Sequence, residues 1–152
     1  MKKVMSVLFV VFMCVALAGC SNEFAEREYN SDNKIAQSED RYAKQCSVFN
    51  PIDGGYSLVV SKFDGRETLW TESVDADKEI EIEIKLTLSE GTVKIVHVDE
   101  EGNITTIIEC TSDSATDEYI SKTVSLKEGR NRIKIVGYDC EDIDLELLSS
   151  DL

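Results

Sequence analysis

Apolar and polar residues alternate strictly along the middle of the chain, between Lys78 and Leu88. The aliphatic residues occupy every second position and charged or polar residues fill the positions between them: Ile80, Ile82, Ile84, Leu86 and Leu88. Successive side chains of a strand point to opposite faces, so a period of two predicts a β-strand with one buried and one hydrated face.

Shorter segments rich in β-branched and aromatic residues flank this strand and are separated by turns that contain glycine, asparagine or aspartate. They predict further strands over residues 56–62, 67–72, 92–98, 104–110, 119–126, 130–138 and 143–148. About eight short strands at regular spacing are typical of an antiparallel sandwich. We therefore expect an all-β fold, a jelly-roll-like antiparallel β-sandwich, over residues 48–150.

The amino-terminal end has a different pattern. Lys2 and Lys3 precede an apolar run that ends in Leu17-Ala18-Gly19-Cys20. A basic start, a short apolar run and a small-residue exit are the features of a secretory signal, and the run is short for a membrane span. The stretch resembles the lipobox of bacterial lipoproteins. This resemblance implies that residues 1–19 are removed and that Cys20 becomes the lipidated first residue, anchored to the cell membrane on its extracytoplasmic face.

Residues 20–47 are mostly charged or polar, with sparse apolar positions. We expect a polar tether there, with partial helix from Ser38 to Gln45; a flexible coil of this length spans about 28 Å. The chain carries 30 acidic and 16 basic residues, a net charge of −14. That charge argues against nucleic acid as a partner, because binding to phosphates requires lysine and arginine.

The carboxyl-terminal end supplies a second resemblance. Residues 124–137 read Val-Ser-Leu-Lys-Glu-Gly-Arg-Asn-Arg-Ile-Lys-Ile-Val-Gly, and a last apolar segment follows after an acidic loop. The pattern resembles the closing hairpin of galactose-binding-like and carbohydrate-binding jelly rolls. Gly129 and Asn131 have a structural reason in such a hairpin, since one takes positive φ and the other bonds turn backbone. The resemblance implies the fold, and with it a carbohydrate-binding accessory module as one alternative function.

Aromatic side chains that could stack on sugars are few. Trp70 is expected to fill the core, and Tyr56, Tyr119 and Tyr138 are the candidates for exposure. The single histidine, His97, lies within a predicted strand and is expected to be a half-buried structural residue rather than a catalytic base.

Acidic and cysteine residues near the end of the chain offer two further hypotheses. The candidate calcium ligands are Asp139, Glu141, Asp142 and Asp144, with a solvated loop as the alternative. Cys110 and Cys140 are the candidate disulfide pair because both lie at predicted strand ends, while three reduced thiols remain the alternative.

No nucleophile–base pair, metal-ligand spacing or nucleotide-binding loop is visible in the sequence, so we predict no catalytic residue and no cofactor. The main expectation is a membrane-anchored, extracytoplasmic, non-enzymatic sandwich that binds a protein or glycan ligand or has a structural role. A small carboxylate-dependent hydrolase is the other alternative, and two carboxylates in an aromatic-lined cleft would favour it.

Overall fold

The computed structural model describes residues 23–150, and these form an antiparallel β-sandwich, which confirms the predicted all-β fold. The strands are β1 (Arg41–Ile52), β2 (Gly55–Val74), β3 (Lys78–Thr87), β4 (Glu90–Val98), β5 (Ile104–Thr111), β6 (Thr116–Leu126) and β7 (Gly129–Leu148). Residues 23–29 are helical, and the short helix α2 (Asp32–Ile35) follows them.

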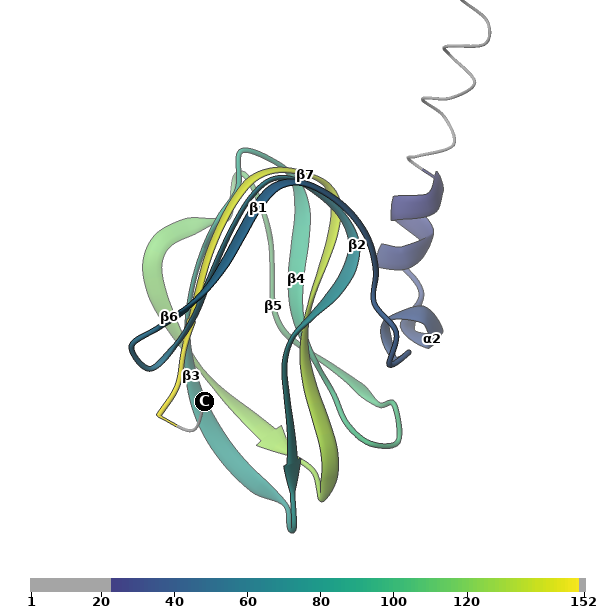
Figure 1. Cartoon of the computed structure of the whole chain (residues 1–152), viewed down its shortest axis with the longest axis vertical. Helices are drawn as coiled ribbons and strands as arrows, with labels where there is room; N and C mark the ends of the chain where they lie inside the picture. The colour runs from purple at the N-terminus through teal and green to yellow at the C-terminus, as the bar shows by residue number, and fades with distance from the viewer. Residues whose placement is uncertain (1–22, 151–152) are drawn as a thin grey trace, which may run out of the picture.

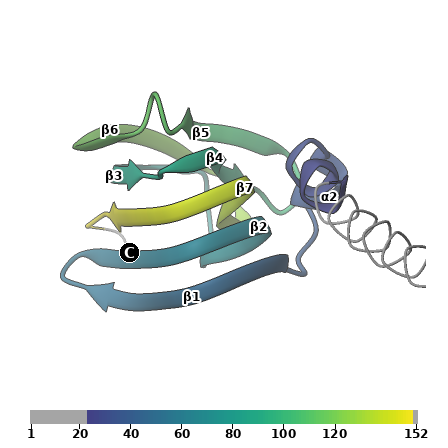
Figure 2. The same cartoon turned by 90° about the horizontal axis from the view of Figure 1, so that it is seen from above.

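The long strands β2 and β7 belong to both layers of the sandwich. They pair with each other along almost their whole length and arch over one end of the molecule together with β1 (Figure 1). One layer has the order β1-β2-β7-β3-β6, whereas β4 pairs with the first half of β7 and carries β5 on its other side. Strand β1 forms an open edge beside β2 (Figure 2).

The core lies between the two layers and contains the strand predicted most clearly. Ile80, Ile82 and Ile84 of β3 are at most 2% exposed and pack in one cluster with inward-facing residues of the other strands. The residues that alternate with them stay hydrated, so the period of two in the sequence corresponds to the two faces of β3.

Two predicted turns are instead bends within continuous strands. Residues 63–66 lie within β2 and residues 139–142 lie within β7. The register between these strands shifts at Phe63/Gly65, and Asp139 and Asp142 adopt positive φ values of 50° and 51°. Such irregularities let a strand bend without ending, so four of the eight expected strands become two. Strand β1, which was not predicted, brings the total to seven.

The predicted tether is wrong for the residues that the structure describes. Residues 41–47, assigned to the tether, form the first half of β1 and pair with β2. The N-terminal segment, residues 23–40, lies against the outer face of the layer that contains β4, where Tyr29 and Ile35 pack on Val96, Val98 and Val136. The segment is therefore part of the folded body.

Buried ion pairs also hold the N-terminal segment. Glu28, almost fully buried, accepts hydrogen bonds from Arg66 of β2 and, at 2.8 Å, from Lys34. Lys134 of β7 donates to the Gln37 carbonyl at 2.7 Å and lies 3.4 Å from the Asp40 carboxylate. Burial lowers the pKa of Lys134, although Asp40 opposes this effect. A buried charge without a partner is costly, so these pairs fix where the segment docks.

Candidate functional site

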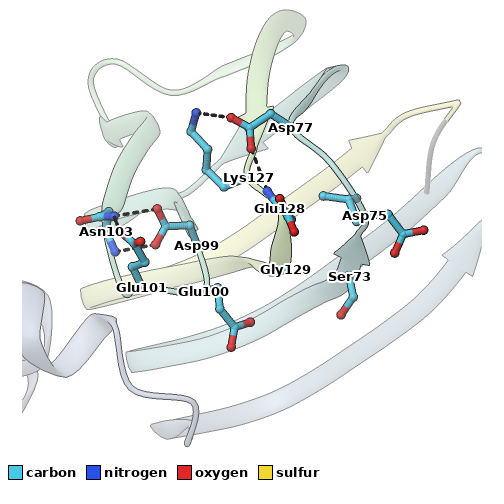
Figure 3. A pocket seen from close by; sticks show the side chains of 11 residues that line it. Ser73, Asp75, Asp77, Asp99, Glu100, Glu101, Asn103, Lys127, Glu128 and Gly129 are labelled. Atoms are coloured by element: carbon cyan, nitrogen blue, oxygen red, sulfur yellow. Dashed lines mark hydrogen bonds and ion pairs between the residues drawn. The ribbon is translucent and has the colours of Figure 1, made fainter.

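An acidic pocket of about 690 Å³ opens at the end of the sandwich opposite the arch (Figure 3). It lies among the β2–β3, β4–β5 and β6–β7 turns. Its carboxylate residues are Asp75, Asp77, Asp99, Glu100, Glu101 and Glu128. Lys127 is the one basic side chain among the lining residues, so the pocket attracts cations and repels anions.

Several of these carboxylates are already bonded within the protein. Asp77 accepts hydrogen bonds from Lys127 Nζ at 2.7 Å and from the Glu128 backbone N–H at 2.9 Å. Asp99 accepts two 2.8 Å bonds from Asn103, one from its backbone and one from its side chain.

These bonds set the direction in which each carboxyl group titrates. The hydrogen bond from Lys127 is the main reason that the pKa of Asp77 is lowered. For Asp99, burial raises the pKa, but the hydrogen bonds from Asn103 and the backbone outweigh it and the net shift is downward. A glycosidase needs one carboxyl group with a raised pKa as its acid, and neither residue meets that need. The lining residues of this pocket also include no aromatic side chain.

The four candidate calcium ligands do not converge. Glu141 pairs with Lys62 at 2.6 Å, and Asp142 accepts a bond from Ser89 Oγ at 3.0 Å. Asp139 contributes its backbone N–H to Asp64, and Asp144 lies in the straight part of β7. Residues 23–150 contain no group of three or more side chains placed to hold a metal ion. The prediction is wrong because the expected loop is a continuation of β7, whose side chains diverge.

The candidate disulfide is absent from the structure, and Cys46, Cys110 and Cys140 are all free thiols. Cys110 and Cys140 are buried, and Cys140 Sγ donates to the Thr92 carbonyl at 3.1 Å. Burial raises the pKa of Cys140 to about 12. The alternative of three reduced thiols is the one that the structure contains.

His97 is a buried structural residue, somewhat deeper than expected. Its Nε2 lies 2.8 Å from Asn131 Oδ1. Asn131 also accepts from the Lys127 backbone N–H and donates to the carbonyls of Lys127 and Gly129, and Gly129 has a φ of 97°. These bonds shape the β6–β7 turn and confirm the structural roles predicted for Asn131 and Gly129.

A second candidate site is the aromatic edge, formed by Phe49 of β1 with Tyr56 and Trp70 of β2. The rings of Phe49 and Tyr56 stack with centroids 5.4 Å apart and planes 15° apart. Phe49 is 44% exposed, and Trp70 is partly buried against the core at the same small apolar recess. A partly exposed Phe49 ring, stacked on Tyr56, therefore lies at the unpaired edge of the sheet.

Exposed apolar side chains concentrate on this hairpin. Of the five large hydrophobic residues exposed in the described part of the chain, four belong to β1 and β2: Tyr42, Val48, Phe49 and Val59. Strand β1 also lacks any acidic residue, in a chain that has 30. The remaining exposed residue is Tyr119 on β6. Of the three tyrosines expected to be exposed, Tyr119 is exposed, whereas Tyr56 and Tyr138 are partly buried.

Phe49 was missed by sequence reasoning because no strand was predicted around it. The available signal was its position two residues before Pro51, since proline within a strand marks an edge.

The predicted signal peptide and the predicted lipidation site, Cys20, lie outside the described residues. Within residues 23–150, no helix has the length and apolar character required to cross a bilayer.

No protein-family model and no curated protein sequence matches the chain. Solved structures that resemble it include the carbohydrate-binding module CBM6cm-2 of Cellvibrio mixtus lichenase 5A in complex with cellotriose. That match has 12% identity and a TM-score of 0.42, and covers 75% of this chain and 91% of the module. The family 29 module CBM29-2 complexed with mannohexaose matches at 15% identity and a TM-score of 0.42, covering 74% and 82%.

A third similar structure is CsCBM6-3 from Clostridium stercorarium in complex with cellobiose. It matches at 13% identity and a TM-score of 0.40, covering 74% of this chain and 88% of the module. Likeness at this level carries no conclusion about what this chain binds.

Proposed function

We propose that this protein is a non-enzymatic binding module, lipid-anchored through Cys20 on the extracytoplasmic face of the cell membrane, and that it binds a glycan at the aromatic edge. The observation that carries the ligand class is the exposed ring of Phe49, stacked on Tyr56 beside Trp70. The apolar C–H faces of a pyranose ring pack on such a planar surface, and nearby polar groups supply direction.

The surroundings of the aromatic edge suit a neutral saccharide. Asn50 and Ser57 flank the stacked pair in sequence, whereas the charged residues of β1, Arg41 and Lys44, lie toward its other end, and Lys44 pairs with Glu67. Hydroxyl groups of a sugar can donate to and accept from amide and hydroxyl side chains. A non-catalytic role fits the acidic pocket, whose bonded carboxylates have lowered pKa values at Asp77 and Asp99.

A thermal-shift screen of the full chain against neutral hexasaccharides and solubilised cell-wall fragments tests this function. A ligand at 100 times its dissociation constant adds about 2.7 kcal/mol to the free energy of unfolding. We expect Phe49→Ala to abolish the shift, because the substitution removes the exposed ring.

The matched control is Tyr119→Ala, since Tyr119 is 45% exposed but lies on β6, away from the aromatic edge. This variant should keep the shift. If a glycan stabilises the wild type and Phe49→Ala equally, the aromatic edge is not the binding site. If no saccharide stabilises the protein, the glycan class is wrong.

A further inference from the structure

The outer face of the layer that contains β4 carries a row of basic side chains along β2 and β7. Lys134 lies opposite Asp40, and Arg66 lies opposite Glu28, so each has a carboxylate from the N-terminal segment. Arg132 is on the same face of β7, two residues before Lys134, because alternate residues of a strand share a face. At two of these three positions, Arg66 and Lys134, the positive charge is therefore balanced by a carboxylate.

At the third position, Arg132, the hydrogen bonding of the guanidinium is incomplete among the described residues. Arg132 is only 8% exposed, and its Nη2 donates to the Ala36 carbonyl at 2.9 Å. Its Nε and Nη1 are shielded from solvent and have no hydrogen-bond partner among the described residues. Buried donors without a partner are costly, and a guanidinium loses more than a neutral group does, so this arrangement favours an acceptor that completes it.

Further donors lie beside Arg132 on the same face. Thr71 pairs with Arg132, and Ser73 pairs with Arg130, across the β2–β7 ladder. Arg130, Thr71 and Ser73 are exposed, and no ion pair within residues 23–150 involves Arg130 or Arg132. The Glu100 carboxylate accepts from the Arg130 backbone N–H at 2.7 Å, and Glu100 and Ser73 both line the acidic pocket. The two guanidinium groups themselves have no carboxylate partner among the described residues, which is unexpected in a chain with 30 acidic and 16 basic residues.

We propose that three of these residues, the arginine strip (Thr71, Arg130 and Arg132), form a binding site for a tetrahedral oxyanion, a phosphate or sulfate group. Two guanidinium forks on one face match the oxygens of such a group, and the Thr71 hydroxyl donates to the same oxygens. The strip lies on the outer face of the sandwich and its ligand is anionic. It is therefore independent of the aromatic edge and of the glycan assigned to that edge.

Binding requires the Arg132 side chain to move. Nε and Nη1 of Arg132 are shielded, so the anion reaches them when the guanidinium turns toward the exposed Thr71 side. This movement gives up the bond to the Ala36 carbonyl. Residues 36–40 have no helix or strand structure, so the adjustment falls outside the regular secondary structure of the N-terminal segment.

Calorimetric titration of the full chain with inorganic phosphate and sulfate, against chloride at matched ionic strength, tests the site. The wild type should bind phosphate and sulfate and not chloride. We expect Arg130→Gln to raise the dissociation constant at least tenfold with an unchanged melting temperature, because Arg130 is exposed. Arg132→Lys keeps the charge but loses the fork, and should weaken binding by a similar factor.

Arg27→Gln is the control, because Arg27 is exposed on the N-terminal helix and the same charge is removed there. It should bind phosphate like the wild type. A further titration uses glycerol phosphate. If it binds more tightly than inorganic phosphate, the ligand of the site is an esterified phosphate group; if it binds more weakly, the ligand is the free ion. Wild-type affinity in both Arg130→Gln and Arg132→Lys would overturn the proposal, as would an equal response to chloride.

Discussion

Cys46 is exposed at an irregular point of β1, where its φ is 47°, whereas Cys110 and Cys140 are buried. The thiolate is the nucleophile that attacks a thiol reagent, so exposure and a low pKa of the cysteine both favour reaction. Burial is the main cause of the raised pKa of Cys110 and of the pKa of about 12 for Cys140. The three thiols should therefore differ sharply in reactivity.

We expect an aromatic disulfide reagent to label Cys46 in a fast phase in the folded protein, and Cys110 and Cys140 only on unfolding. Mass mapping of the labelled peptides measures this order. The fast phase should disappear in Cys46→Ser. Fast labelling of Cys140 in the folded protein, or a native Cys110–Cys140 disulfide, would contradict the buried free thiols seen here.

Single residues with a local structural reason could be predicted from the sequence. Asn131 bonds turn backbone and Gly129 takes positive φ, and both roles follow from the residue type in a turn. The carboxylates at residues 139–144 could not be placed, because their directions depend on β7 bending rather than ending there. The stacking of Phe49 on Tyr56 depends on the β1–β2 register, which no local pattern specifies.

Among the elements, the N-terminal segment and β1 departed most from expectation. Strands with a buried face show a period of two, as in β3. Strand β1 is an open edge that includes Pro51, and most of its side chains are exposed, so it has no such period. The N-terminal segment docks through a few buried apolar residues and through ion pairs, and in the sequence its many charges resemble those of a solvated tether.

The docked segment should contribute to stability through Ile35, which is fully buried in α2 against the outer sheet face. Burying an isoleucine side chain contributes about 1.5–3 kcal/mol, and a charge there would cost more. We expect Ile35→Asp to lower the free energy of unfolding by at least about 2 kcal/mol in urea titrations.

Asn33→Asp adds the same charge at an exposed position of the same helix and should change stability by less than about 0.5 kcal/mol. Equal stability of Ile35→Asp and the wild type would mean that the N-terminal segment does not stay docked in solution.

For the whole molecule, the proposed lipid anchor can be tested separately from any ligand. The Lys2-Lys3 start, the apolar run and Leu17-Ala18-Gly19-Cys20 motivate it. We expect the wild type to enter the detergent phase on phase separation and Cys20→Ala to remain in the aqueous phase. Two or more acyl chains hold a protein stably at a bilayer, whereas one does so only marginally. Aqueous partitioning of both proteins would exclude the anchor.

The docking of the N-terminal segment has a consequence for how far the sandwich can move from a bilayer. Ala25, fully buried, follows Cys20 by five positions, and five residues of extended chain reach at most about 17 Å. The start of the described helix lies beside the arch, and the acidic pocket lies at the other end of the sandwich (Figure 1). An anchor at Cys20 would thus keep the start of the helix, and the arch beside it, within a short distance of the lipid. The acidic end would lie farther from the bilayer whenever the long axis of the sandwich stood upright on it.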